Sequence, residues 1–285
     1  MITEGVQGAS LVLDNSARYW AGEFEIAIRY FTPGSRLRTM DGDLRWLRHQ
    51  MFKEWTGSGV YGPRSINVMT LVSDAHDKMQ RADPLADLAV LDGVCDQLEF
   101  AADELRHYVL LARLHHAAVG PTALSLHDMG ELREGCALTE LRYQLRATRA
   151  GQMAVDLSEG GGLGLYFGIQ RVLGPVATKP AGDAMLCDAV DRIVDDERGH
   201  LLYNFQRAAA GDYSADDWAQ IDARLREISR QKLRERNEQF GDVLSDTELS
   251  SIDRGDNAWR PFADHYLQFI RDALTAGAAQ HRTAD

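Results

Sequence analysis

Two copies of a Glu-x-x-His string constrain this chain more than any other feature. The first copy holds Glu104 and His107, and the second holds Glu197 and His200. Residues three apart on a helix project from the same face, so each string presents a carboxylate and an imidazole together. With 9 histidines in 285 residues, about half a match is expected by chance, so a single copy would be weak evidence. Two such helices facing each other could offer all four side chains to a pair of metal ions.

Apolar residues recur at helical spacing over nearly the whole chain, which predicts an all-α protein. Proline and glycine clusters set the expected helix limits, which are about 15–31, 43–55, 63–81, 92–118, 137–172, 183–210, 215–240 and 246–276. A long connection over about 119–136 then crosses between two helical hairpins. We expect one all-helical domain over 1–285, with a metal-binding core bundle at about 63–210 and flanking helices at 15–56 and 215–276.

A di-metal site in a four-helix bundle needs one further carboxylate from each of the two remaining helices. The helix break near 173–182 lies midway between Glu159 and Glu197, so antiparallel helices would bring these two carboxylates level. The connection near 82–92 lies midway between Asp74 and Glu104 in the same way, although the apolar stripe of the first helix points away from Asp74. Three alternatives to Asp74 therefore remain, namely Asp77, Glu54 and Glu23.

An aspartate precedes each glutamate of the two strings. Asp103 and Asp196 occupy matching places, and each could accept the second ring N–H of the histidine on the opposite helix, which fixes the tautomer of a ligating imidazole. Four carboxylates would balance the charge of two divalent cations, with both histidines neutral. They are those of Asp74, Glu104, Glu159 and Glu197. Oxygen and imidazole donors without thiolate favour iron, with manganese as the alternative.

The string from Asp103 to His107 resembles the D-E-x-R-H motif of bacterial multicomponent di-iron monooxygenases, which belong to the ferritin-like superfamily. The copy from Asp196 to His200 departs from that motif, because its arginine lies one place earlier. The Asp-Ala-His-Asp run at 74–77 also resembles the Glu-Ala-His-Asp run around the first ligand of aldehyde-deformylating oxygenases, with Asp in place of Glu. The resemblance covers about 63–210, and it implies a ferritin-like four-helix bundle with a di-iron site.

The resemblance implies a non-haem di-iron oxygenase or oxidase that activates O2 to hydroxylate, N-oxygenate or desaturate a small organic substrate. Two electrons must be resupplied in each turnover, so we expect an electron donor such as a ferredoxin or a flavin reductase. A ferritin-like ferroxidase and a di-metal peroxidase are the alternatives. The substrate is not specified by the motifs, and a homodimer is left open.

Three glycines follow Glu159 directly, and each costs about 0.5–1 kcal/mol relative to alanine inside a helix. One interpretation is that Gly160, Gly161 and Gly162 leave room for O2 and substrate, with Tyr108 and Tyr166 as walls of the pocket. The other interpretation is close packing between helices, or a break in the helix.

The formal net charge of −12 argues against a nucleic-acid-binding protein. Three widely spaced cysteines suit reduced thiols, and no stretch has the length of a membrane span, so we expect a cytoplasmic protein that does not bind membranes. The mixed-charge run at 224–238 is typical of a solvated amphipathic helix.

Overall fold

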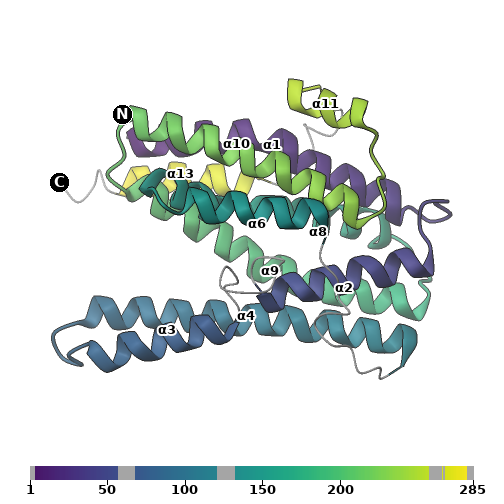
Figure 1. Cartoon of the computed structure of the whole chain (residues 1–285), viewed down its shortest axis with the longest axis horizontal. Coiled ribbons are helices and arrows are strands. Elements are labelled where there is room, and N and C mark those ends of the chain that lie inside the picture. Colours follow the sequence, from purple (N-terminus) through teal and green to yellow (C-terminus); the bar gives the residue numbers. More distant parts are fainter. Residues whose placement is uncertain (1–3, 57–67, 121–131, 257–264, 266, 281–285) are drawn as a thin grey trace.

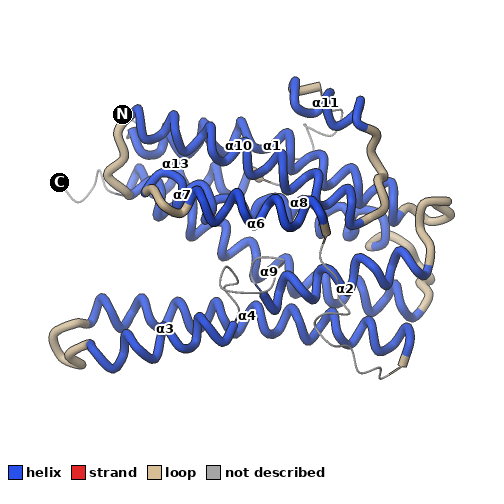
Figure 2. Tube along the Cα trace, in the orientation of Figure 1, coloured by secondary structure: helices blue, strands red, loops and turns tan. Residues whose placement is uncertain are grey.

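A computed structural model describes residues 4–56, 68–120, 132–256, 265 and 267–280 of the chain. Helices are the only regular secondary structure over these ranges (Figure 2), so the prediction of an all-α protein is confirmed for them. None of the helices described there combines the length and the apolar character needed to cross a bilayer.

The helices form two groups that α9 (Ala181–Ala210) connects (Figure 1). In the larger group, α1 (Glu4–Phe31) packs on α8 (Gly160–Leu173) and on α10 (Ala215–Gln239). The smaller group consists of α2 (Met40–Thr56), α3 (Val68–Arg81) and α4 (Leu88–Val119). Because α9 contacts α1 and α8 on one side and α4 on the other, it joins the two groups.

Four shorter helices and a 3₁₀ turn complete the described fold. They are α6 (Arg133–Leu145), α7 (Arg149–Asp156), the turn η1 (Leu157–Glu159), α11 (Asp246–Arg254) and α13 (Gln268–Gln280). Helices α6 and α7 pack against α10, α11 packs against α1, and α13 packs against α9 and α1.

Aromatic side chains pack where α1, α2 and α10 meet. The Phe31 ring contacts Tyr30, Trp46 and Phe240 edge-on, with centroids 5.0, 5.7 and 5.8 Å away. Trp46 and Phe240 stack with their centroids 5.7 Å apart. Aromatic pairs of this kind contribute about 0.5–1.5 kcal/mol each beyond their buried area. They fix the end of α1 against α2, which carries part of the site described below.

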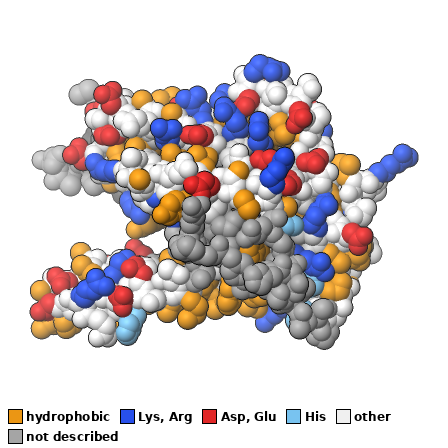
Figure 3. Space-filling view, in the orientation of Figure 1, with side chains coloured by type: hydrophobic (Ala, Val, Ile, Leu, Met, Phe, Trp, Pro, Cys, Tyr) orange, Lys and Arg blue, Asp and Glu red, His pale blue; other side chains and the backbone are white. Residues whose placement is uncertain are grey.

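The hairpin of α3 and the first half of α4 projects from the rest of the molecule (Figure 1). Val68 and Ala75 are the buried residues of α3. Large apolar side chains remain exposed along this arm, and Leu85 and Met69 are 87% and 64% accessible. In Figure 3 they appear as orange atoms between charged groups. The arm therefore contributes little to the core.

Two of the expected helices are interrupted in the structure. The helix predicted over 137–172 breaks before Thr148, whose hydroxyl accepts from the Gly151 N–H and so caps α7, and again at η1. The helix predicted over 246–276 ends at Gly255, which adopts a φ of 94° that favours glycine. The breaks before α7 and after α11 lie at capping residues, whereas η1 has no side-chain cap. The turn η1 is the break that places Glu159 at the end of a 3₁₀ turn.

Candidate metal centre

Acidic and imidazole side chains from four segments converge on one cavity between the two helix groups. Glu54 comes from α2 and Glu159 from η1, while α4 and α9 each supply one Glu-x-x-His pair. The cavity has a volume of about 510 Å³, and all four glutamates line it. That volume lies within the range of small-molecule sites. The residues that converge are Glu54, Glu104, His107, Glu159, Glu197 and His200.

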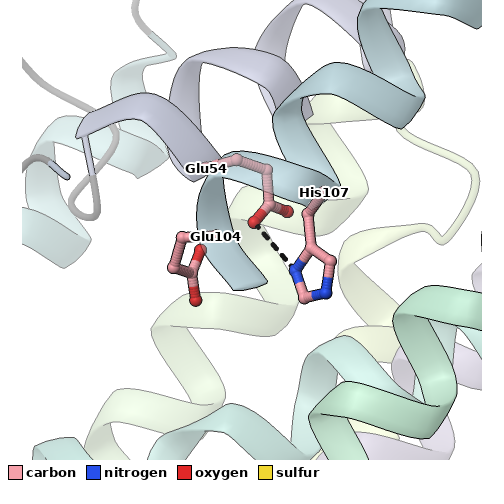
Figure 4. A group of neighbouring side chains, drawn as sticks. All are labelled: Glu54, Glu104 and His107. Carbon is pink, nitrogen blue, oxygen red and sulfur yellow. Dashed lines mark ion pairs between the residues drawn. The ribbon is translucent and has the colours of Figure 1, made fainter. Parts of the chain in front are cut away.

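The convergent side chains form two overlapping groups of potential ligands. Ligand atoms of Glu54, Glu104 and His107 lie within 4.8 Å of one another, and Figure 4 shows their carboxylates and imidazole facing a common space. Ligand atoms of Glu104, Glu197 and His200 form the second group within the same distance. The Nδ1 atom of His107 also lies 3.6 Å from an oxygen of Glu54 and 3.6 Å from one of Glu197. Glu104 and Glu197 thus lie between the two histidines.

Both histidines are oriented by an aspartate of the opposite helix. The Nε2 atom of His107 lies 3.2 Å from Asp196, and that of His200 lies 2.9 Å from Asp103. This cross-helix pairing is the one that the sequence predicts. The Nδ1 atoms of both rings are buried and make no hydrogen bond to any described residue. In the neutral imidazole whose Nε2–H donates to the aspartate, the Nδ1 lone pair is available to a cation.

Burial and mutual repulsion perturb the carboxyl groups of the cluster. Burial and the charges of Glu54 and Glu197 raise the pKa of Glu104 well above its ordinary value. Burial and Glu197 likewise raise the pKa of Glu159 to about 7. Burial opposes the charge on His107, but the carboxylates of Glu54 and Glu197 outweigh it and raise that pKa to about 9. Without a cation, the cluster therefore holds protons at neutral pH, which is the condition that metal binding relieves.

The structure does not bring Asp74 to the cluster, which corrects the expectation for the first carboxylate. The Asp74 side chain is 54% accessible on the projecting arm, where it pairs with Lys78 at 2.8 Å and accepts from Gln97 at 3.0 Å. Among the three alternatives, Asp77 is 58% accessible on the same helix and Glu23 is fully buried beside Arg236 at 3.2 Å. Glu54 is the alternative that lies in the cluster, although its helix was expected to flank the core.

A pattern in the sequence could have identified Glu54. The buried face of α2 includes Leu47, Gln50, Met51 and Glu54, so this glutamate lies on an apolar stripe instead of the solvent face. The Gln50 amide donates to Glu54 at 2.5 Å. A carboxylate on a buried helix face requires a partner, and a bound cation would provide one.

Of the three glycines after Glu159, two lie in a helix contact and one lines the cavity. A Cβ at Gly160 would lie 2.5 Å from the Trp20 ring, and one at Gly161 would lie 1.9 Å from the Glu23 carboxylate. These two positions allow α1 to approach closely, which corrects their assignment to a substrate pocket. Gly162, in contrast, has open space at its Cβ and lines the cavity.

The two tyrosines expected beside the metals also differ in placement. Tyr166 is buried and lines the cavity, where its hydroxyl makes no hydrogen bond to a described residue. Burial, together with the charge of Glu54, raises its pKa well above 10. Tyr108 instead packs against Trp55, with centroids 5.1 Å apart.

Sequence reasoning missed the cationic side chains that line the cavity. The mixed-charge run at 224–238 was expected to be solvated, but α10 buries Lys232, Glu235 and Arg236. Two further cavity residues, Arg142 and Arg146, come from α6 and the turn after it. Burial lowers the pKa of Lys232 to about 8. A helix such as 224–238, whose apolar face also carries acidic and basic residues, can form a buried polar network as well as a solvent-exposed face.

The donor set suits a hard divalent cation with some affinity for imidazole. Carboxylate oxygens and two imidazole nitrogens, without thiolate among them, are typical ligands of iron and manganese. The unpaired Nδ1 atoms and the unpaired Oε2 atom of Glu159 leave donors for such ions. No protein-family model matches the chain, and no curated protein or solved structure is significantly similar to it.

Proposed function

We propose that this protein is a non-haem di-iron oxygenase or oxidase with a ferritin-like arrangement of its metal-binding helices. One observation carries the proposal: two Glu-x-x-His pairs face each other among four glutamates that line one cavity, and neither Nδ1 atom is hydrogen-bonded to a described residue. The resemblance of the Asp103–His107 string to the D-E-x-R-H motif of di-iron monooxygenases supports the choice of iron. Manganese is the alternative metal.

The two overlapping ligand groups support two ions, and the charge of the four glutamates matches that of two divalent cations. Four ionised glutamates carry four negative charges, which two divalent cations neutralise while the histidines stay uncharged. Burying the same carboxylates without compensation would oppose folding. The raised pKa values of Glu104 and Glu159 show how strongly the cluster resists four uncompensated charges.

The protein residues have distinct roles in this proposal. Glu54 and His107 would hold one ion, Glu159 and His200 would hold the other, and Glu104 and Glu197 lie where they could bridge the two. Asp103 and Asp196 hold the imidazoles in the tautomer that frees Nδ1. Bound iron would supply the reduction of O2 and the transfer of oxidising equivalents to a substrate.

The cavity beside the cluster favours an organic substrate over simple iron handling. It offers about 510 Å³ next to the ligands, with apolar walls from Phe100, Val155 and Tyr166. Hydroxylation, N-oxygenation and desaturation all fit such a site. Hydroxylation and N-oxygenation transfer one oxygen atom of O2 to the substrate and reduce the other to water, and desaturation reduces both atoms to water. Each reaction needs two electrons that the substrate does not supply, so the proposal includes a donor such as a ferredoxin or a flavin reductase.

The test is an anaerobic titration of the metal-free chain with Fe(II), followed by addition of O2. We expect two irons per chain and rapid O2 consumption. Glu104→Gln should lose at least one iron and slow the consumption of O2. Glu99→Gln provides the matched control, because Glu99 lies on the same helix but is exposed.

Two results would contradict the proposal. Full iron content in Glu104→Gln would remove the assigned ligand set. Growth of ferric mineral inside a large shell of subunits, with many more than two irons per chain, would assign the protein to iron storage instead.

A further inference from the structure

Five cationic side chains share the cavity with the four glutamates, and two of the five are neutralised locally. Lys53 pairs with Glu235 at 2.9 Å, and Arg236 pairs with Glu23 at 3.2 Å. Both pairs are buried, and their acids lie outside the metal cluster. They add no net charge to the cavity. The cations that remain are Arg142, Arg146 and Lys232.

These three cations have no carboxylate within 4.0 Å in the part of the chain that the structure describes. Arg142 donates to the Ser158 hydroxyl at 2.7 Å, and Lys232 donates to the Ser158 carbonyl at 3.0 Å. Ser158 directly precedes Glu159, so both cations lie beside the proposed ligands. The Nε atoms of Arg142 and Arg146 are buried without a hydrogen-bond partner among the described residues. Burial lowers the pKa of Arg146, and the carboxylate of Asp156 opposes this through its charge, but this carboxylate is itself paired with Arg207.

The charge of the cavity depends on the metal ions. Without them, the glutamates and the three unpaired cations partly compensate one another. With two divalent ions bound, the glutamates are neutralised, and Arg142, Arg146 and Lys232 leave an excess of about three positive charges. Guanidinium groups bind carboxylate and phosphate oxygens with two parallel hydrogen bonds. The remaining walls include Val68, Leu71 and Phe100, which suit an apolar body.

We propose that the cavity binds an anionic substrate, in which an apolar body carries an oxyanion held by Arg142, Arg146 and Lys232. This inference rests on the proposed function, because the positive excess exists only when the metal cluster is filled. It names the substrate class of the same site: an organic acid or a phosphate monoester with an apolar portion directed toward the metals.

The test compares three probes of equal chain length on the Co(II)-loaded protein by isothermal titration calorimetry. The probes are hexanoate, hexyl phosphate and 1-hexanol. We expect at least one anion to bind ten-fold or more tightly than the alcohol. The tighter anion identifies whether carboxylate or phosphate is the preferred source of the oxyanion. Equal affinity for the alcohol and both anions would overturn the inference.

Variants identify which groups hold the anion. Arg142→Gln and Lys232→Met should each weaken the preferred anion about ten-fold or more. Arg146→Gln removes a side chain that makes no hydrogen bond to a described residue, so it is the variant least expected to disturb folding. Arg224→Gln is the control, because Arg224 is exposed on the same helix as Lys232. Unchanged anion affinity in all three cavity variants would show that the metal ions hold the probe, and would reject the cationic site.

Cobalt content and the melting temperature, measured before each titration, separate the two proposals. A chain that binds no Co(II) contradicts the metal centre and the anion site together. A chain that binds two Co(II) ions but no anion contradicts the anion site alone. A two-metal chain whose anion affinity falls in the cavity variants supports both.

Discussion

The ligand assignment depends on single residues that lie on buried helix faces. Glu54 is 6% accessible and its ligand atoms lie within 4.8 Å of those of Glu104 and His107, whereas Asp74 is paired with Lys78 in solvent. Without a cation, the neighbouring His107 and Glu104 hold the protons, because their pKa values are raised, and Glu54 stays ionised. The contrast between these two acids provides a direct experiment.

Glu54→Gln should remove about one metal ion per chain, because an amide lacks the charge that holds a divalent ion. Asp74→Asn should retain both ions, since that side chain lies on the projecting arm. Elemental analysis after equilibration with Fe(II) or Mn(II) measures the content. If Glu54→Gln retained two ions, or if Asp74→Asn lost one, Asp74 rather than Glu54 would be the first carboxylate ligand.

The aspartates behind the histidines provide a second test at this scale. Asp103→Asn and Asp196→Asn should each weaken metal binding by about 10–100-fold, because an amide can stabilise the wrong imidazole tautomer. Competition with a chromophoric chelator measures the affinity. The Asp103 variant also loses an ion pair with Arg106, so Arg106→Gln is the control for that contact. Wild-type affinity in both aspartate variants would leave these carboxylates with no role in orienting ligands.

Individual residues differ in how far the sequence alone could place them. Glu104 and His107 are fixed to one face by the period of a helix, and the same holds for Glu197 and His200. Glu159 follows from an antiparallel turn at 174–180. The buried face of α2 marks Glu54 as an acid that needs a partner. Assigning it to this cluster required knowledge of which helix packs on α4, because α4 is long enough to take α3 along its first half and α2 along its second. Gln97 contacts Asp74 in the first half, and His115 contacts Arg48 in the second.

At the scale of elements, the contact between α1 and α8 depends on glycines after η1. The Cβ of an alanine at Gly161 would overlap the Glu23 carboxylate, which is already held by Arg236, while Gly162 has open space. The sequence could not separate these positions, because the direction of each glycine depends on how α8 is rotated against α1. The break before α7 was also missed, since it follows from capping by Thr148 rather than from proline or glycine. The turn η1 has no side-chain cap and lies directly before the glycines, where a break in the helix was one of the two interpretations.

Gly161→Ala should destabilise the protein by about 1–3 kcal/mol, because buried Glu23 must shift. Gly162→Ala should leave stability unchanged or raise it by up to about 1 kcal/mol, since alanine is the better helix former. Urea denaturation of the metal-free chains compares the two. Equal destabilisation by both substitutions would contradict the packing described for α1 and α8.

At the scale of the whole molecule, the proposed metal ligands come from helices that belong to two groups. Glu54 and Glu104 belong to the smaller group, Glu159 to the larger, and Glu197 to the connecting helix α9. The cavity between the groups thus contains charge that opposes their association until cations or protons neutralise it. The fold stability should therefore depend on pH and on metal together.

The sign of the pH dependence follows from the raised pKa values. The pKa of Glu159 rises from 4.5 in the unfolded chain to about 7 in the folded protein, so the folded state binds more protons between these values. Stability present below pH 4.5 is consequently lost as the pH rises through 7. His107, raised from 6.5 to about 9, extends the same loss to higher pH. Glu235 and Glu54, with pKa values lowered to about 2, act in the opposite sense but only below about pH 4.5.

We therefore expect the metal-free protein to lose stability between pH 5.5 and 8.5, by on the order of 2–3 kcal/mol for the Glu159 contribution. The Mn(II)-loaded protein should keep its stability over this range, because bound cations replace the protons. The difference in melting temperature between the two forms should therefore widen as the pH rises. Glu159→Gln should flatten the metal-free profile below pH 7, while Glu99→Gln should leave it unchanged. Calorimetric melts across this range of the metal-free and Mn(II)-loaded wild type and of the two metal-free variants provide the measurement. A metal-free profile that is flat or rises with pH would show that Glu159 is ionised in the folded protein, and that the carboxylates do not crowd one another as the structure places them.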